Sequence, residues 1–197
     1  MSRDSLLNDI MLKRRETIGY LCTLAACVLL VCAACGRFSQ PEARPLQTVP
    51  RVDLDRYLGR WYEIAKYPHR FQEGCVASTA TYARLSDGRI RVENECREGT
   101  PDGKVRRAIG VAEIATGDPS SAKLTVQFFW PFHGDYWIIE LDADYQFAVV
   151  GHPSREYLWI LSRHPHLEEG VYQQLLRKIE AQGYDLSRIQ RTLQPGG

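Results

Sequence analysis

The chain has 197 residues, of which 25 are Lys or Arg and 24 are Asp or Glu, so its formal net charge is +1. No stripe of basic residues follows a path that could track a phosphate backbone, which argues against nucleic acid as a partner. The length after a leader suits one core, and we place a single domain at residues 51–194 with a short tail at 195–197.

The first 34 residues have the order of a signal peptide. Lys13-Arg14-Arg15 precedes a mostly apolar run from residue 18 to residue 31. This run is shorter than the roughly 20 apolar residues that a membrane-spanning helix needs. We therefore expect residues 1–34 to be a removed leader.

Small residues then lead into a cysteine, Cys35, and a polar, proline-bearing stretch follows it to residue 50. This arrangement resembles a bacterial lipoprotein signal, which implies that Cys35 is acylated and that residues 35–50 tether the domain to a membrane. Cys27 is the alternative, because Leu24-Ala25-Ala26 before it fits the consensus better but leaves a much shorter apolar core.

Two cysteines remain inside the domain, at the ends of a predicted hairpin. Residues 75–83 and 89–96 are rich in Val, Thr, Tyr and Ile, and Ser86-Asp87-Gly88 between them is a turn signal. Folding at this turn brings Cys75 within about two residues of Cys96, an offset that a bulge could absorb. In an exported protein this predicts a disulfide, with free thiols in a catalytic or metal site as the alternative.

Short strand signals continue to near the end of the chain. Residues 123–128 alternate most clearly, with Leu124, Val126 and Phe128 on one face. Further strands are expected at 104–115, 135–141, 146–150 and 156–162, with turns at 130–134 and 142–145. An i, i+4 apolar stripe predicts one helix over 168–182, which Gly183 would cap.

Two segments bracket this series, Gly59-Arg60-Trp61-Tyr62-Glu63-Ile64-Ala65 and Tyr157-Leu158-Trp159-Ile160-Leu161-Ser162-Arg163. They resemble the first and last strands of the lipocalin family. The resemblance covers about residues 52–194 and implies an all-β fold, an eight-stranded antiparallel up-and-down barrel with one C-terminal helix packed outside. It also implies that Trp61 plugs the closed end and that Arg163 lies across the indole.

An eight-stranded barrel has room for one small ligand, so its function depends on the lining. Taking Trp61 and Arg163 as inward-facing fixes the parity of the first and last strands. Glu63 and Ala65 then lie inside as well, and so do Tyr157, Trp159 and Leu161. For the other strands, alternation selects an apolar and aromatic lining suited to a long acyl chain. The predicted ligand-binding residues are Tyr82, Leu124, Val126, Phe128, Tyr136, Ile138, Val150, Tyr157 and Trp159.

Several segments, including Phe128-Phe129-Trp130-Pro131-Phe132, resemble most closely the bacterial lipocalins of the branch that includes apolipoprotein D. This implies a non-enzymatic lipoprotein of the bacterial outer membrane that faces the periplasm. Its partners would be a fatty acid or lysophospholipid and the membrane, and its role membrane maintenance or stress.

Two other classes of function stay open from the sequence. Outward aromatics such as Phe129 and Trp137 could make the barrel a protein-interaction module or a homodimer, although the helix could instead cover one of them. A lipocalin-type enzyme would need a free Cys75. We expect no cofactor and no metal, because His164-Pro165-His166 is only a fragment of a metal site.

Overall fold

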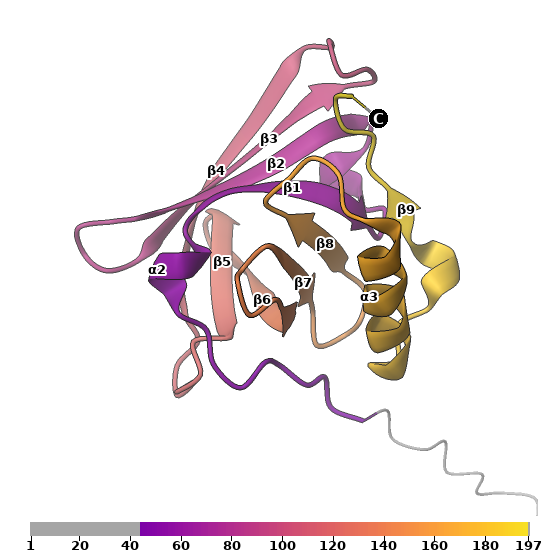
Figure 1. Ribbon diagram of the computed structural model, residues 1–197. Helices are drawn as coiled ribbons and strands as arrows, with labels where there is room; N and C mark the ends of the chain where they lie inside the picture. The colour runs from indigo at the N-terminus through magenta and orange to yellow at the C-terminus, as the bar shows by residue number, and fades with distance from the viewer. Residues whose placement is uncertain (1–43, 197) are drawn as a thin grey trace, which may run out of the picture. The chain divides into compact units, whose positions relative to one another are not determined.

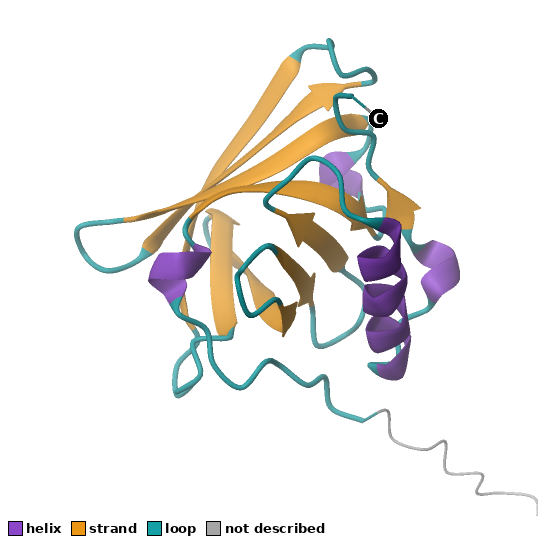
Figure 2. Ribbon diagram, viewed as in Figure 1, coloured by secondary structure: helices purple, strands orange, loops and turns teal. Residues whose placement is uncertain are grey.

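The computed structural model describes residues 44–196. The predicted leader, the acylated Cys35 and the alternative Cys27 lie outside the described residues. The fold is built from one antiparallel sheet that closes on itself, as Figures 1 and 2 show.

Eight strands form the barrel wall, and each pairs with the next along the chain. They are β1 (Gly59–Lys66), β2 (Cys75–Arg84), β3 (Ile90–Glu98), β4 (Val105–Ile114), β5 (Lys123–Phe129), β6 (Phe132–Leu141), β7 (Phe147–Gly151) and β8 (Leu158–Ser162). β8 returns to pair with β1, and β1 pairs with β2, which closes the barrel. The predicted eight-stranded up-and-down barrel is confirmed.

Two helices and a short ninth strand complete the part of the fold that the structure describes. A one-turn helix, α2 (Leu54–Tyr57), precedes β1, and Asp53 caps it by accepting hydrogen bonds from backbone N–H groups. The helix α3 (Glu169–Ala181) lies beside the barrel, next to β8 and β9 (Figure 1). β9 (Gln190–Arg191) pairs with the end of β1. Single 3₁₀ turns occupy Arg70–Gln72 and Leu186–Arg188. Within residues 44–196, no helix is long and apolar enough to cross a membrane.

The apolar side chains divide into two cores, one inside the barrel and one between the barrel and α3. Tyr172, Leu175 and Ile179 of α3 are buried against outward-facing residues of β1, β7 and β8. Trp137, one of the two predicted outward aromatics, packs against this outer core and is partly buried. The division explains why β7 and β8 are apolar on both faces, since each face has its own core.

Two details of the predicted pattern are wrong. Ala65 was expected inside, but a β-bulge between Glu63 and Ala65 turns it outward, where it belongs to the outer core. The turn expected over 130–134 is shorter, because β6 already begins at Phe132. Both are local changes of register that leave the barrel order intact.

The predicted disulfide between Cys75 and Cys96 is present, with the two Cα atoms 5.5 Å apart. Cys75 lies opposite Glu98 in the β2–β3 ladder, and a bulge follows between Val76 and Thr79. The expected offset of two residues is therefore found. Because both sulfurs are bonded, the alternative of a free Cys75 nucleophile is removed.

Replacing both cysteines, Cys75→Ser with Cys96→Ser, should lower the free energy of unfolding by about 3 kcal/mol, because the bridge closes a loop of 21 residues in the unfolded chain. Urea denaturation of the mature protein under oxidising conditions measures the difference. A reductant should bring the wild type to the level of the variant and leave the variant unchanged. Equal midpoints without reductant would contradict this expectation.

Candidate ligand-binding site

One end of the barrel is closed by a tryptophan and an arginine. The indole of Trp61 is fully buried, and its Nε1 donates to the Tyr57 carbonyl oxygen at 2.8 Å. The Arg163 guanidinium lies over this ring, with its Cζ 3.9 Å from the ring centroid. This is the predicted closure pair.

Arg163 is also held by main-chain oxygens. It donates to the carbonyls of Arg60 (2.9 Å), Arg56 (2.8 Å) and Tyr145 (3.2 Å). These carbonyls come from α2, from β1 and from the 142–145 turn, so a single guanidinium fastens three segments together. Burial lowers the pKa of Arg163 from its ordinary value, against smaller opposing effects of Tyr57 and Tyr82.

A glycine makes this approach feasible. Gly59 has φ +94°, and a Cβ there would lie 3.3 Å from the Arg163 Nη1. Any other residue would be strained at this φ and would push against the guanidinium. The glycine at position 59, two residues before Trp61, is therefore required by the close approach of Arg163 at the closed end.

The structure places eight of the nine predicted lining residues in the inner core of the barrel. These are Tyr82, Leu124, Val126, Phe128, Tyr136, Ile138, Val150 and Trp159. The ninth, Tyr157, lies just before β8, and its ring is parallel to that of Trp159 with 6.0 Å between centroids. Tyr157 thus belongs to the rim of the open end.

The inner side chains are not equally buried. Leu124, Ile138 and Val150 are almost completely buried, and form part of the floor above Trp61. Val126, Phe128, Tyr136 and Trp159 face the same interior but are only partly buried. Partial exposure of side chains on the inner face means that the interior is not filled by side chains at their level.

Small residues surround this level. Val126 lies between Ala112 of β4 and Gly134 of β6 in the two ladders. The Phe128 ring rests on Gly110, where a Cβ would come within 2.8 Å of it. Glycine and alanine on the neighbouring strands thus leave room that larger residues would occupy.

Three tyrosine hydroxyls meet inside the barrel. The Tyr136 hydroxyl lies 2.8 Å from that of Tyr57 and 2.8 Å from that of Tyr82. Burial raises the pKa of Tyr82 to about 12, and those of Tyr57 and Tyr136 well above 10. The three hydroxyls stay neutral, and since two hydrogen bonds use only two of their three protons, one O–H is left over for a polar group.

A buried ionic cluster near the open end was missed from the sequence. The Glu63 carboxylate accepts from Thr192 Oγ1 at 2.6 Å and from Gln72 Nε2 at 2.7 Å, and Lys66 Nζ lies 3.0 Å from it. Gln72 in turn accepts from the Trp159 indole at 3.1 Å. The cluster therefore joins β1, the β1–β2 loop, β8 and the C-terminal tail.

The C-terminal tail is part of the wall. Beyond the short β1–β2 ladder, the Ala77 N–H donates to the Leu193 carbonyl, and the Gln194 side-chain amide donates to the carbonyls of Glu63 and Ser78. Where β1 and β2 no longer pair with each other, their backbone groups form hydrogen bonds to residues 190–194 instead. No alternating pattern signals this strand, because it is two residues long.

His69 closes the inner side of the β1–β2 loop. Its ring centroid lies 5.4 Å from that of Trp159 and 5.7 Å from that of Tyr157. Neither ring nitrogen has a hydrogen-bond partner of good geometry among residues 44–196. Burial accordingly lowers the pKa of His69, against smaller opposing effects of Gln72 and Glu63.

This lowered pKa predicts a pH dependence. Because the folded pKa lies below the unfolded value of about 6.5, the contribution of neutral His69 to stability is complete above that pH and is lost as the pH falls through the folded pKa. In His69→Phe, which keeps the aromatic contact, this part of the decline should be absent. The difference is measured by comparing the free energies of unfolding of the two proteins at pH values from about 7.5 to about 4.5. Parallel curves would contradict the prediction.

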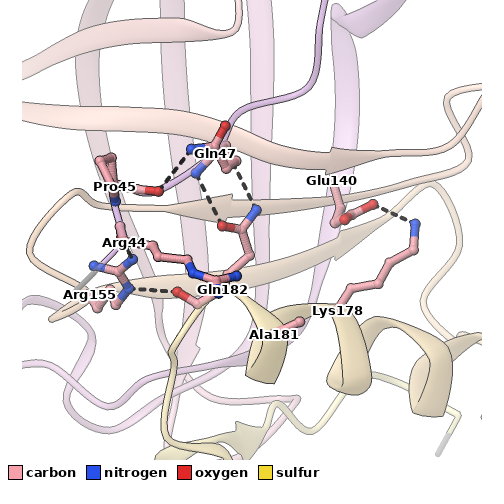
Figure 3. Close-up of a pocket in the computed structure, with 8 residues that line it drawn as sticks. All are labelled: Arg44, Pro45, Gln47, Glu140, Arg155, Lys178, Ala181 and Gln182. Carbon is pink, nitrogen blue, oxygen red and sulfur yellow. Dashed lines mark hydrogen bonds and ion pairs between the residues drawn. The ribbon is translucent and has the colours of Figure 1, made fainter. Parts of the chain in front are cut away.

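A pocket lies outside the barrel, beside the end of α3 (Figure 3). Its polar groups are already paired: Lys178 with Glu140 at 2.6 Å, and Gln47 with Gln182. We assign no ligand to it. Among residues 44–196, no three His, Cys, Asp or Glu side chains are grouped so that they could hold a metal ion.

Comparison with protein families identifies the barrel. Residues 52–194 match the model of a lipocalin-like domain. The outer membrane lipoprotein Blc of Escherichia coli K12 is 41% identical over 173 residues, which cover 87% of this chain and 95% of Blc. Temperature-induced lipocalin-1 of Arabidopsis thaliana is 42% identical over 161 residues, covering 78% and 85% of the two chains.

More distant matches agree on the fold. Apolipoprotein D of Rattus norvegicus is 31% identical over 186 residues, covering 84% of this chain and 94% of its own. Among solved structures, insecticyanin from the tobacco hornworm Manduca sexta superimposes with a TM-score of 0.63 at 21% identity, covering 77% of this chain and 85% of insecticyanin.

Proposed function

We propose that this chain, which belongs to the lipocalin family, binds a fatty acid or a lysophospholipid inside its barrel and acts as a lipid carrier or store. Lipocalins bind small hydrophobic ligands and are generally not catalysts. The acyl chain of the ligand would lie against the partly exposed inner residues and exclude water from them.

One observation carries this proposal. Val126, Phe128, Tyr136 and Trp159 lie on the inner face of a closed barrel and yet are only partly buried. Each methylene buried against such side chains contributes about 0.8 kcal/mol, which favours a long, unbranched chain over a small polar solute. The spare hydroxyl proton of the tyrosine group and the Lys66 ammonium offer polar partners at two depths.

A titration tests the chemical class of the ligand. Delipidated mature protein is titrated with fatty acids of increasing chain length, and the change in tryptophan fluorescence on binding reports occupancy. Trp159 is the partly buried tryptophan of the inner face, so we expect the change to come from its indole. Affinity should rise about 15-fold for each added pair of methylenes until the barrel is filled. Saturation at one ligand per barrel is expected, and an affinity independent of chain length would reject an acyl site.

We further propose that the protein is anchored to the outer membrane through an acylated Cys35 and faces the periplasm, in membrane maintenance or stress. Blc relatives of three bacteria, at 35–41% identity, are named outer membrane lipoproteins. Labelling with a fatty-acid analogue tests this directly. Cys35→Ser should abolish incorporation, while Cys27→Ser should leave it unchanged.

A further inference from the structure

Large apolar side chains are exposed around the open end of the barrel. Trp130 is 85% exposed, Phe132 76%, Phe71 72% and Phe129 69%. Three of them form the tip of the β5–β6 hairpin, and Phe71 lies in the β1–β2 loop. Both connections lie at the end of the barrel opposite Trp61, as the strand pairings require.

The loop that carries Phe71 is held in place. The Arg106 guanidinium, from β4, donates to the Phe71 carbonyl at 3.0 Å and to the Glu73 carbonyl at 3.1 Å. Glu63 holds the same loop through Gln72. The Phe71 ring is thus presented to solvent by a fastened backbone, so its exposure is built into the loop.

The chain enters the domain at the same end. The Arg155 guanidinium donates to the Arg44 carbonyl and, at 2.7 Å, to the Gln182 carbonyl (Figure 3). Arg155 belongs to the β7–β8 loop, which is another connection of the open end. From there the chain runs toward the closed end. On the way, the Val49 N–H donates to the Ile138 carbonyl and the Val52 N–H donates to the Ser120 carbonyl.

This entry point limits where an anchor can hold the barrel. Eight residues lie between Cys35 and Arg44, so the two Cα atoms are at most about 32 Å apart. An anchor at Cys35 is therefore joined to the barrel at its open end, which favours an orientation with the open end nearest to the bilayer.

The loops of the open end carry no net charge. Arg70, Lys104 and Arg155 are balanced by Glu73, Asp102 and Glu156 in the connections 67–74, 99–104, 130–131 and 152–157. An acidic or basic partner would find no complementary field there. Exposed Trp and Phe on a neutral rim are typical of contact with a membrane–water interface.

We propose that the aromatic rim formed by Phe71, Phe129, Trp130 and Phe132 inserts into the surface of the bilayer and places the open end of the barrel against the lipid. A hydrophobic ligand could then move between bilayer and barrel without crossing water. This inference rests on the proposed anchor, and its occupant is the lipid surface itself.

Depth-dependent quenching of Trp130 tests the contact. The full acylated protein is reconstituted into phosphatidylcholine liposomes that contain brominated lipid. Emission should be quenched, and Trp130→Phe should remove most of the quenching because Trp61, Trp137 and Trp159 lie in the two cores. In the Trp130→Phe background, Ser86→Trp places an exposed reporter in the β2–β3 turn of the closed end, where no quenching is expected.

The outcomes separate the two proposals. Protein that does not co-float with the liposomes contradicts the anchor. Protein that co-floats without Trp130-dependent quenching, or that shows quenching of the Ser86→Trp reporter instead, overturns the rim contact while leaving the anchor intact. A rim covered by a second copy of the chain would also protect Trp130 from the lipid, and would overturn the inference in the same way.

Discussion

Val126→Trp should reduce the affinity for a long-chain fatty acid by about 100-fold. The larger side chain would fill the space between Ala112 and Gly134. It displaces a volume equal to about four methylenes of ligand, which corresponds to about 3 kcal/mol. Titration of the delipidated variant beside the wild type gives the ratio of dissociation constants.

A neighbouring position supplies the control. Thr125 is adjacent in β5 but lies on the outer face, opposite Glu113 and Asp135. Thr125→Trp should bind the same fatty acid as the wild type does. Unfolding midpoints of both variants show whether the barrel is intact. A folded Val126→Trp variant with wild-type affinity would place the ligand elsewhere than in the barrel.

Trp61→Ala should lower the free energy of unfolding by 3–5 kcal/mol, the typical cost of removing a fully buried large aromatic side chain. The cost has three parts here: lost apolar burial, the unpaired Tyr57 carbonyl, and the loss of the ring beneath Arg163. Urea denaturation followed by circular dichroism measures it, with the slope m checked for two-state behaviour.

The matched control is another tryptophan. Trp130 is exposed, and Trp130→Ala should change the stability by no more than about 0.5 kcal/mol. If Trp61→Ala cost less than about 1 kcal/mol, Trp61 and Arg163 would not be the element that closes the barrel.

Much of this fold follows from the sequence because its signals are local. The alternation of Leu124, Val126 and Phe128 places the inner face of β5 correctly, and the turn at Ser86-Asp87-Gly88 fixes the hairpin that carries the disulfide. The two bracketing motifs indicate how the barrel closes. Trp61 in the first strand and Arg163 after the last barrel strand meet at the closed end, so these two strands are neighbours.

The rest depends on contacts that no local pattern reveals. The bulge at Ile64 changes the parity of β1 without a change in composition, and so Ala65 was misplaced. The ionic cluster joins Glu63 to Thr192 across 129 positions of sequence. Either residue alone looks like an ordinary polar position, and only the closed barrel shows that both are needed at one point of the wall.

The central claim is that the barrel holds a lipid, and native mass spectrometry of the exported protein tests it most directly. The mature chain is purified without detergent, weighed intact and then extracted with organic solvent. The account predicts one acyl lipid per barrel, released by extraction and absent from Val126→Trp but present in Thr125→Trp. A barrel that is empty on purification, and that also takes up neither fatty acid nor lysophospholipid, would contradict it.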